Sequence, residues 1–250
     1  MAYISHIPPP LSFILACKSP ISLHIFIFCD IITSMEEIEY PIRINRYLFL
    51  KNYCSRRQAD LMIKQSLVRI NGKVAILGQK VEKTDDVQVA NRLKKLKESF
   101  QYVLFNKPRG VVSHNPQEGE QSVEDVYKSK VRLSPIGRLD KDSNGLMILT
   151  NDGRIIDKLL NPKYDHEKEY NVRVDKDLKP SFQTKMERGV DIEGYVTKPC
   201  KVKATGAKTF SIILTEGKKH QIRRMTASLG YQVKKLKRVR FGPIRLFGVE

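Results

Sequence analysis

The chain has 250 residues, of which 41% are hydrophobic, and its 45 Lys and Arg outnumber its 27 Asp and Glu to give a formal net charge of +18. This length allows one large domain or two smaller ones, and the composition excludes collagen-like and repetitive proteins. Such a positive excess attracts polyanions, so nucleic acid is the first partner to consider. Because some basic proteins are merely well solvated or bind acidic membranes, the positions of the charges have to decide.

The four cysteines, Cys17, Cys29, Cys54 and Cys200, lie far apart and form no C-x-x-C pair. Their spacing matches none of the usual zinc motifs and gives no disulfide framework. We therefore expect reduced thiols in a cytoplasmic protein.

The first 34 residues differ from the rest of the chain, because they are apolar and contain only one Lys and one Asp. A secretory signal needs a basic start, an unbroken apolar run and a small-residue cleavage site, and a membrane span needs ~20 apolar residues. The segment has none of these, so we expect no membrane association. We interpret residues 1–34 as an unstructured tail or as an extension ahead of a true start at Met35.

Residues 35–96 read as a small unit of helices and a hairpin. Ser55 and Gln58 form a capping-box pattern, which predicts a helix from Arg56 to about Ser66. A shorter helix is expected before it, with Ile44, Tyr47 and Leu48 on one face. The pair Asn71-Gly72, between two β-rich runs, predicts a hairpin because both residues accept a positive φ.

Basic residues cluster on this unit, where a solvated face is the plainest interpretation and a phosphate grip is the alternative. The segment "RINRYLFLKNYCSRRQADLMIKQSLVRINGKVAILGQKV" resembles the S4 RNA-binding domain over about fifty residues. That resemblance implies that Arg56, Arg57 and Lys64 contact RNA.

A polar, charged linker is expected at 91–101, and residues 97–250 then form the second domain. Strand-like runs alternate with turns at 102–113, 145–150, 169–175 and 210–217, and helical patterns intervene at 122–130, 154–161, 180–189 and 220–230. Strands and helices in no strict βαβ order predict an α+β fold with a largely antiparallel sheet.

The stretch "PIGRLDKDSNGLMILTNDG" spaces Asp140, Asp142 and Asn144 as a calcium-binding EF-hand loop would. The twelfth position, Asn151, cannot supply the bidentate carboxylate of such a loop, and a β-type run follows where a helix should leave. The calcium interpretation therefore fails. Such polar clusters are also common in ordinary turns, and on spacing alone a turn without function is favoured.

Other residues and motifs of the chain favour a function for Asp140 over a turn without function. Arg138 lies two residues earlier, and a basic helix, "HQIRRMTASLG", is predicted later with Ile222, Met225 and Leu229 as its buried stripe. The stretch around Asp140 closely matches the signature of the RsuA-like branch of the ribosomal RNA pseudouridine synthases. "LFNKPRGVVS", "DHEKEYNVRVD" and "LTEGKKHQIRRM" agree with that family in order and spacing, and "DHEKEY", "VTKPCKVK" and "GYQVKKLKRVR" are most similar to its F-type branch, which acts on large-subunit RNA.

The resemblance implies that Asp140 is the nucleophile of a reaction that detaches uracil at N1, rotates it and rejoins it at C5. This chemistry requires no cofactor and no metal. Whether the carboxylate first attacks the sugar or the base stays open. A nearby cation favours the ionised carboxylate, and the motif assigns that role to Arg223.

The same resemblance assigns the remaining site residues. Tyr170 is expected to stack on the target base, Leu214 to line its pocket, and Arg138 to help move the uridine out of its stack, a step that costs ~a few kcal/mol. Further phosphate contacts are expected from Lys107, Arg109 and Arg224. The basic tail, with ten Lys or Arg and no acidic residue from Gly217 to Val249, is expected to contribute as well.

The predicted protein is thus a monomeric enzyme that modifies ribosomal RNA, either free or within a precursor particle. The alternative is a non-catalytic S4-type RNA-binding or ribosome-assembly protein that kept the fold.

Overall fold

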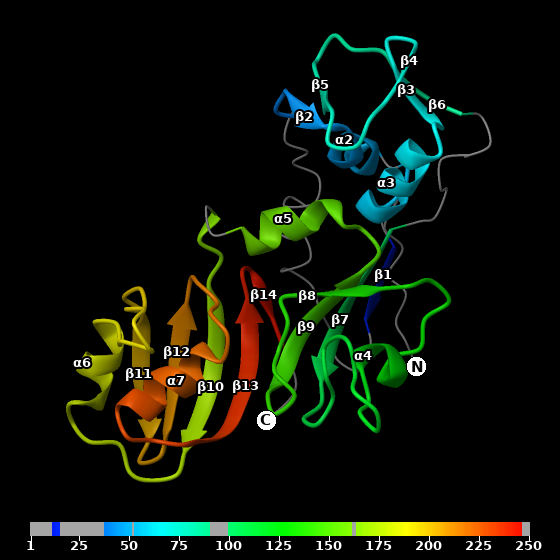
Figure 1. Ribbon diagram of the computed structural model, residues 1–250. Helices are drawn as coiled ribbons and strands as arrows, with labels where there is room; N and C mark the ends of the chain where they lie inside the picture. Colours follow the sequence, from blue (N-terminus) through cyan, green and yellow to red (C-terminus); the bar gives the residue numbers. More distant parts are fainter. Residues whose placement is uncertain (1–11, 16–37, 52, 91–99, 162–163, 247–250) are drawn as a thin grey trace. The chain divides into compact units, whose positions relative to one another are not determined.

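The computed structural model describes residues 12–15, 38–51, 53–90, 100–161 and 164–246 (Figure 1). The chain divides into two compact units, which we call the small unit, residues 32–99, and the large unit, residues 1–31 and 100–250. The predicted linker at 91–101 falls mostly outside the described residues. No helix among the described residues is long and apolar enough to cross a bilayer.

The small unit combines two helices with two small sheets. Its elements are β2 (Ile42–Arg43), α2 (Ile44–Leu50), α3 (Arg56–Lys64), β3 (Val68–Ile70), β4 (Lys73–Val74), β5 (Lys80–Val81) and β6 (Val87–Val89). Strand β2 pairs with β5, and β3 lies between β4 and β6. Buried side chains of α2, α3 and the strands, among them Leu48, Ala59 and Val68, form one core.

Local signals account for most of this unit. The capping box at α3 is confirmed, since the Ser55 Oγ accepts from the Gln58 amide at 3.3 Å and the Ser55 amide donates to the Gln58 Oε1 at 2.9 Å. The helix ends at Lys64, slightly earlier than predicted, because Ser66 adopts a positive φ of 59°. The hairpin is also confirmed, with Asn71 at φ 51° and Gly72 at φ 77° between β3 and β4.

The large unit contains a nine-stranded mixed sheet in the order β1-β7-β9-β13-β10-β12-β11, with β8 on β9 and β14 on β13 (Figure 1). Its elements are β1 (Ser12–Leu15), β7 (Gln101–Lys107), α4 (Val123–Val126), β8 (Ser134–Ile136), β9 (Asn144–Thr150), α5 (Arg154–Leu160), β10 (Lys168–Val174), α6 (Phe182–Glu187), β11 (Lys201–Gly206), β12 (Thr209–Leu214), α7 (Gln221–Ser228), β13 (Val233–Phe241) and β14 (Ile244–Arg245). Pairing is antiparallel except between β1 and β7 and between β9 and β13. The predicted α+β fold with a largely antiparallel sheet is confirmed.

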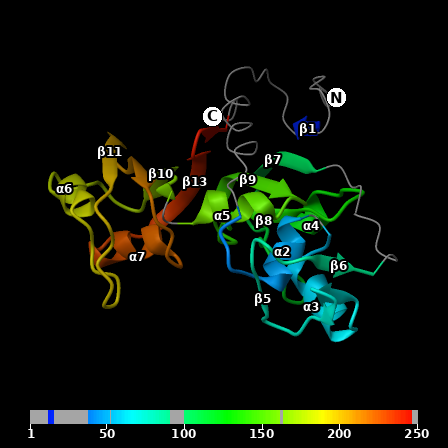
Figure 2. The same ribbon diagram turned by 90° about the horizontal axis from the view of Figure 1, so that it is seen from above.

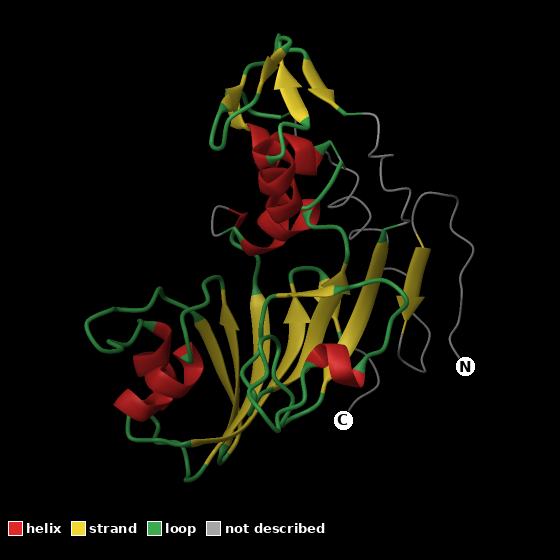
Figure 3. Cartoon of the chain, turned by 45° about the vertical axis from the view of Figure 1, so that its right-hand side comes forward, coloured by secondary structure: helices red, strands yellow, loops and turns green. Residues whose placement is uncertain are grey.

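Helices cover one face of this sheet, where Figures 2 and 3 show α4 and α7 on the same side. Phe182 and Met186 of α6 and Ile222 and Met225 of α7 pack on the strands β10 to β13 as one buried cluster. A second cluster lies over β7 and β9 and includes Leu139, beside the predicted nucleophile. The partly buried Tyr170 packs against both clusters, so the helix-covered face is continuous across the sheet.

The two halves of the sheet meet at a narrow joint between β9 and β13. Only Lys237 with Asn144 and Arg238 with Gly145 pair across it, whereas β13 pairs with β10 along most of its length. Gly145 is required here, because a Cβ at this position would overlap the Arg238 backbone and its φ of 112° disfavours other residues. Residues before β9 therefore belong to one half, and β10, β12 and α7 belong to the other.

Three expectations need correction. The basic segment at 233–241 is not a tail but the central strand β13, in which Leu236, Arg238 and Phe241 are buried, and its phosphate contacts stay a prediction. Four residues of the amino-terminal segment, Ser12–Leu15, pair with β7, while residues 1–11 and 16–37 lie outside the described part. The helix predicted over 122–130 is a single turn, Val123–Val126, after which Tyr127 is extended.

Candidate active site

The predicted nucleophile lies in a tight loop between β8 and β9. Leu139 is buried in the core beneath the loop, whereas the Asp140 side chain keeps 36% of its surface accessible. The Ser143 amide donates to the Asp140 carbonyl at 3.0 Å and closes the turn. Burying one residue and exposing the next fixes the loop and presents the carboxylate at the surface. The run that follows is strand β9, as the sequence predicted.

The segment that begins with "NKPRG", where phosphate contacts are predicted, donates hydrogen bonds to the backbone of this loop. The Ser113 Oγ donates to the Leu139 carbonyl at 2.6 Å, and the Gly110 amide donates to the Lys141 carbonyl at 2.8 Å. The segment therefore holds the backbone on both sides of Asp140.

The prediction that Lys107 contacts RNA is wrong, because the Lys107 side chain is fully buried. Its Nζ donates to the carbonyls of Val111 at 2.5 Å and Pro108 at 3.0 Å. Burial lowers the pKa of Lys107 to about 8, and the charges of Asp140 and Asp142 act in the opposite direction. Its ammonium group therefore places positive charge under the loop and does not face solvent.

Two basic side chains of the α7 region face the carboxylate from the other half of the sheet. The His220 Nε2 lies 3.4 Å from the Asp140 Oδ1, and the Arg223 Nε lies 4.0 Å from the Asp140 Oδ2. The Arg223 Nη2 also donates to the Asp142 carbonyl at 3.1 Å and to the buried Ser143 Oγ at 3.2 Å. These bonds hold the guanidinium beside Asp140, so the pairing predicted for Arg223 is present.

A buried polar network sets the start of α7. The Glu216 carboxylate accepts from the Gln221 Nε2 at 2.6 Å and from the Tyr195 hydroxyl at 2.6 Å. The Gln221 Oε1 in turn accepts from the Lys218 amide at 2.9 Å. This network ties both ends of the short connection, and His220 adopts the left-handed conformation, φ 52°, that turns its ring toward Asp140. Strain of this kind in a non-glycine residue is common at functional sites.

Tyr170 and Leu214 lie on the neighbouring strands β10 and β12. In the antiparallel register Tyr170 faces Ile212, and Lys168 faces Leu214, so the two predicted pocket residues are two positions apart. Leu214 is buried in the core, and Tyr170 is half-buried. On its other side Tyr170 faces Arg238 of β13. No direct contact joins either residue to Asp140 among the described interactions.

The predicted RNA contacts fall into two groups. Arg138 and Arg109 are exposed beside the loop, and the Arg109 Nε lies 3.6 Å from an Asp142 carboxylate oxygen. Arg224, in contrast, donates to the Glu193 carboxylate at 2.6 Å and to the Ile192 carbonyl at 2.8 Å, so it binds α7 to a loop of the protein. In the small unit Arg56, Arg57 and Lys64 are all exposed on α3.

The comparisons with known proteins agree with this arrangement. Residues 101–228 match the family model of RNA pseudouridylate synthases, and residues 42–87 match that of the S4 domain. The chain belongs to the RNA pseudouridylate synthase family. The predicted resemblance to this family and to the S4 domain is confirmed.

Individual relatives share 40% to 44% of their aligned residues with this pseudouridylate synthase. It is 44% identical to the dual-specificity RNA pseudouridine synthase RluF of Escherichia coli K12, over 83% of this chain and 72% of that one. It is 40% identical to the ribosomal large subunit pseudouridine synthase B of Bacillus subtilis, over 83% and 88% of the two chains. A crystal structure of a pseudouridylate synthase aligns with a TM-score of 0.60 at 29% identity, over 82% of this chain and 90% of that one.

Sequence reasoning missed four side chains of this synthase's site: His220, Ser143, Lys107 as a buried cation, and Arg238. His220 is the first residue of the predicted helix, but in the structure it lies just before α7, and its left-handed backbone brings it to Asp140. The buried state of Arg238 has no local signal, because Arg238 lies in the basic run "KKLKRVR", which suggests exposure. Lys107 follows an apolar run, but a lysine beside Pro108 and Arg109 also suggests exposure.

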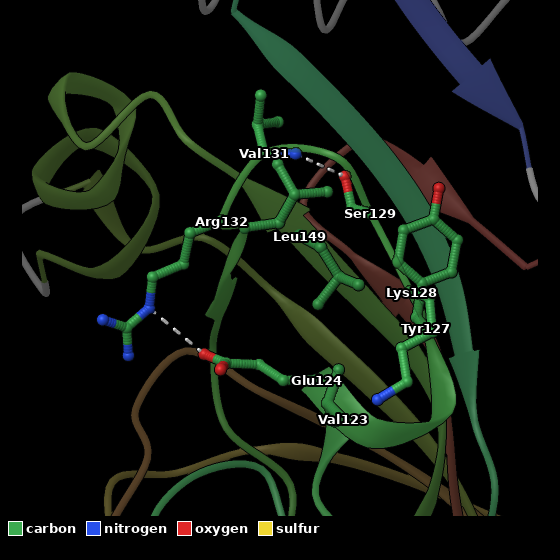
Figure 4. Close-up of a pocket in the computed structure, with 9 residues that line it drawn as sticks. Val123, Glu124, Tyr127, Lys128, Ser129, Val131, Arg132 and Leu149 are labelled. Atoms are coloured by element: carbon green, nitrogen blue, oxygen red, sulfur yellow. Dashed lines mark hydrogen bonds and ion pairs between the residues drawn. The ribbon is translucent and has the colours of Figure 1, made fainter.

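A separate pocket lies away from the Asp140 loop. It measures about 270 Å³ and is lined by α4 and the chain that follows, with Val123, Tyr127, Val131 and Leu149 as its apolar walls and Glu124 near Arg132 at its rim (Figure 4). None of the predicted site residues lines it. Within the described ranges no group of three or more His, Cys, Asp and Glu is arranged to hold a metal ion.

Proposed function

We propose that this protein converts specific uridines of ribosomal RNA, in the large subunit, to pseudouridine, with Asp140 as the covalent nucleophile. The observation that carries the proposal is the accessible Asp140 carboxylate held between Arg223 and His220 on a braced loop. Family membership supplies the reaction class, and the name of the Bacillus subtilis relative supports the large-subunit substrate.

The chemistry suits a carboxylate. Asp140 forms a bond to a carbon of the target nucleotide and later leaves unchanged, which divides one difficult rearrangement into easier steps. The N1–C1′ bond breaks, the base rotates, and a C5–C1′ bond forms, while C5 loses a proton and N1 gains one. Because reactant and product are isomers, this series of reaction steps needs neither an electron donor nor water. Arg223 places a positive charge beside the attacking carboxylate.

The other residues act on the base. The target nucleotide has to leave its stack, and the exposed Arg138, next to the Asp140 loop, is placed to fill the gap. Tyr170 stacks on the extruded base, where its hydroxyl can assist proton removal at C5, and Leu214 lines the apolar wall of the pocket. The half-buried Tyr170 and the buried Leu214 have the environments that these roles require.

The small unit anchors the RNA through the exposed Arg56, Arg57 and Lys64 of α3. Because ribosomal RNA and its precursor particles are the substrates, we expect the enzyme to work in the cytoplasm, and we expect it to act as a monomer.

The decisive experiment replaces Asp140 by Asn, which keeps the size of the side chain and removes its charge. Turnover of uridine in ribosomal RNA should fall by at least about 10⁴-fold, as it does when a covalent nucleophile is lost, while RNA binding stays nearly unchanged. Asp142→Asn is the matched control in the same loop, because that exposed carboxylate points to Arg109, and it should retain most of the turnover.

The same assay separates the enzyme from the non-catalytic alternative. A wild-type protein that binds ribosomal RNA but leaves every uridine unchanged would be an S4-type binding or assembly protein. Equal turnover in Asp140→Asn and the wild type would remove the nucleophile assignment and leave the enzyme class intact.

A further inference from the structure

Arg238 is a buried cation without an acidic partner. Its side chain is 1% exposed and lies in the central strand β13. In the part of the chain that the structure describes, no carboxylate lies within ion-pair distance of its guanidinium. Burial lowers the pKa of Arg238, and the neighbouring Tyr170 hydroxyl acts in the opposite direction. An arginine in this position is costly unless its donors are used.

The donors of Arg238 are used on the two ends of the Asp140 loop. The Nη2 donates to the Gly137 carbonyl at 2.6 Å, and the Nε donates to the Leu146 carbonyl at 2.7 Å. Gly137 precedes Asp140 by three residues, and Leu146 follows it by six. Charge-assisted bonds to both ends fix where the loop leaves β8 and where it enters β9.

The same side chain contacts residues of the opposite half of the sheet. Arg238 faces Tyr170 across the antiparallel pair of β13 and β10, and its guanidinium lies over the Phe241 ring at 5.3 Å. The neighbouring Tyr170 opposes the effect of burial on the pKa of Arg238, so the two side chains are electrostatically coupled. One planar group therefore connects the loop that carries Asp140 to the tyrosine expected to stack on the base.

The backbone pairing at the joint that Arg238 spans is short. Strands β9 and β13 pair through only two residues on each side, yet Asp140 comes from one half of the sheet and Tyr170, Leu214 and Arg223 come from the other. A small slide at this joint would change the distance between nucleophile and base pocket. A displacement of about 1 Å at a reacting centre can cost about 100-fold in rate.

We propose that Arg238 is a positioning residue that holds the Asp140 loop in register with the half of the sheet that carries Tyr170, Leu214 and Arg223. The inference rests on the proposed function and adds a residue that the family motifs quoted above do not assign. Arg238 touches no reacting atom in this role. It acts through the Gly137 and Leu146 carbonyls and through Tyr170.

The test compares Arg238→Lys and Arg238→Met with Arg240→Met. Arg240 is a matched control, because it lies two positions along the same strand, is mostly buried and uses its donors on Glu167 and Glu169, away from the loop. Arg240→Met also removes one positive charge, as Arg238→Met does. Single-turnover conversion at saturating ribosomal RNA, the RNA dissociation constant and thermal unfolding are measured for each variant.

Both Arg238 variants should lose about 100-fold in the single-turnover rate, with RNA affinity equal to that of Arg240→Met. Arg240→Met should keep the wild-type rate. Tyr170→Phe provides a second readout: combined with Arg238→Lys it should cost less than the product of the two single effects, whereas combined with Arg240→Met the effects should multiply.

An Arg238→Lys enzyme that folds and turns over at the rate of Arg240→Met would overturn the inference. Failure of both Arg238 variants to fold would do the same, since it would assign the residue to stability alone. A wild-type protein without turnover would instead refute the proposed function, so the two failures are distinguishable.

Discussion

Helix α3 in the small unit and helix α7 in the large unit both contain two consecutive arginines. The surroundings of these arginines differ between the two helices. On α3 the side chains of Arg56, Arg57 and Lys64 are exposed. On α7 both Arg223 and Arg224 bond to oxygen atoms of other segments of the protein. A run of arginines therefore shows that a helix is basic, but not whether it faces RNA or builds a site.

The difference comes from what surrounds each helix. The buried stripe of α3 packs against neighbours close in sequence, and its basic side is left outside. Helix α7 begins beside the loop of β8 and β9, some eighty residues earlier in the chain, whose carbonyls attract the arginine donors. Charges next to unsatisfied carbonyls become structural, whereas charges without such neighbours remain available to a polyanion.

The largest effect is expected at Arg223 of α7. Arg223→Gln should reduce turnover by about 10²–10³-fold, because it removes a preorganised cation from the nucleophile, while RNA affinity changes little. Single-turnover kinetics and RNA titration measure the two effects. Arg224→Gln is the control on the same helix, and its rate loss should be smaller because its partner is Glu193. Equal losses in both variants would mean that α7 acts only as a basic surface.

Lys107 differs from the arginines of both helices, because its side chain is fully buried in the large unit. Its folded pKa of about 8 lies below its ordinary value of 10.5, so between these values the unfolded chain binds the proton and the folded chain does not. Stability therefore rises with pH in this window, and that gain is lost as pH falls through the folded pKa. From pH 7 to 9.5 the wild type should gain about 2 kcal/mol relative to Lys107→Met.

Denaturant unfolding of wild type and Lys107→Met at several pH values checks this expectation. Groups common to both proteins cancel in the difference, which leaves the titration of Lys107. A difference that does not vary with pH would show that the lysine stays charged through its bonds to Pro108 and Val111.

The smallest effect is expected on α3. Replacing Arg56 and Arg57 together by Gln should lower the slope of log K against log salt by about 2, or about 1 for each lost phosphate contact, and should leave the rate at saturating RNA unchanged. Lys208→Gln is a control on the other unit that removes one positive charge, from an ammonium group that lies 3.8 Å from Asp177. A slope equal to that of the wild type would place the RNA anchor elsewhere.

Features that depend on residues close in sequence could be predicted more fully than features that depend on distant segments. The Ser55 cap and the Asn71-Gly72 turn depend on neighbours within three residues, so the sequence predicted both correctly. Asp140, Arg223, Tyr170 and Leu214 were assigned by motif, and the structure brings Asp140 and Arg223 together across eighty residues. The central strand β13 was missed because its basic residues conceal its alternating buried positions.

The sequence alone determined the two-unit order, the reaction family and the candidate nucleophile, because these depend on local patterns and on motifs that keep their spacing. The tertiary structure alone decided which cations are buried and what they hold: Lys107 under the Asp140 loop and Arg238 across the joint of the sheet. The physical reason is that a charge is kept inside only by oxygen atoms that surround it in space. Those carbonyls come from segments whose proximity no short stretch of sequence encodes.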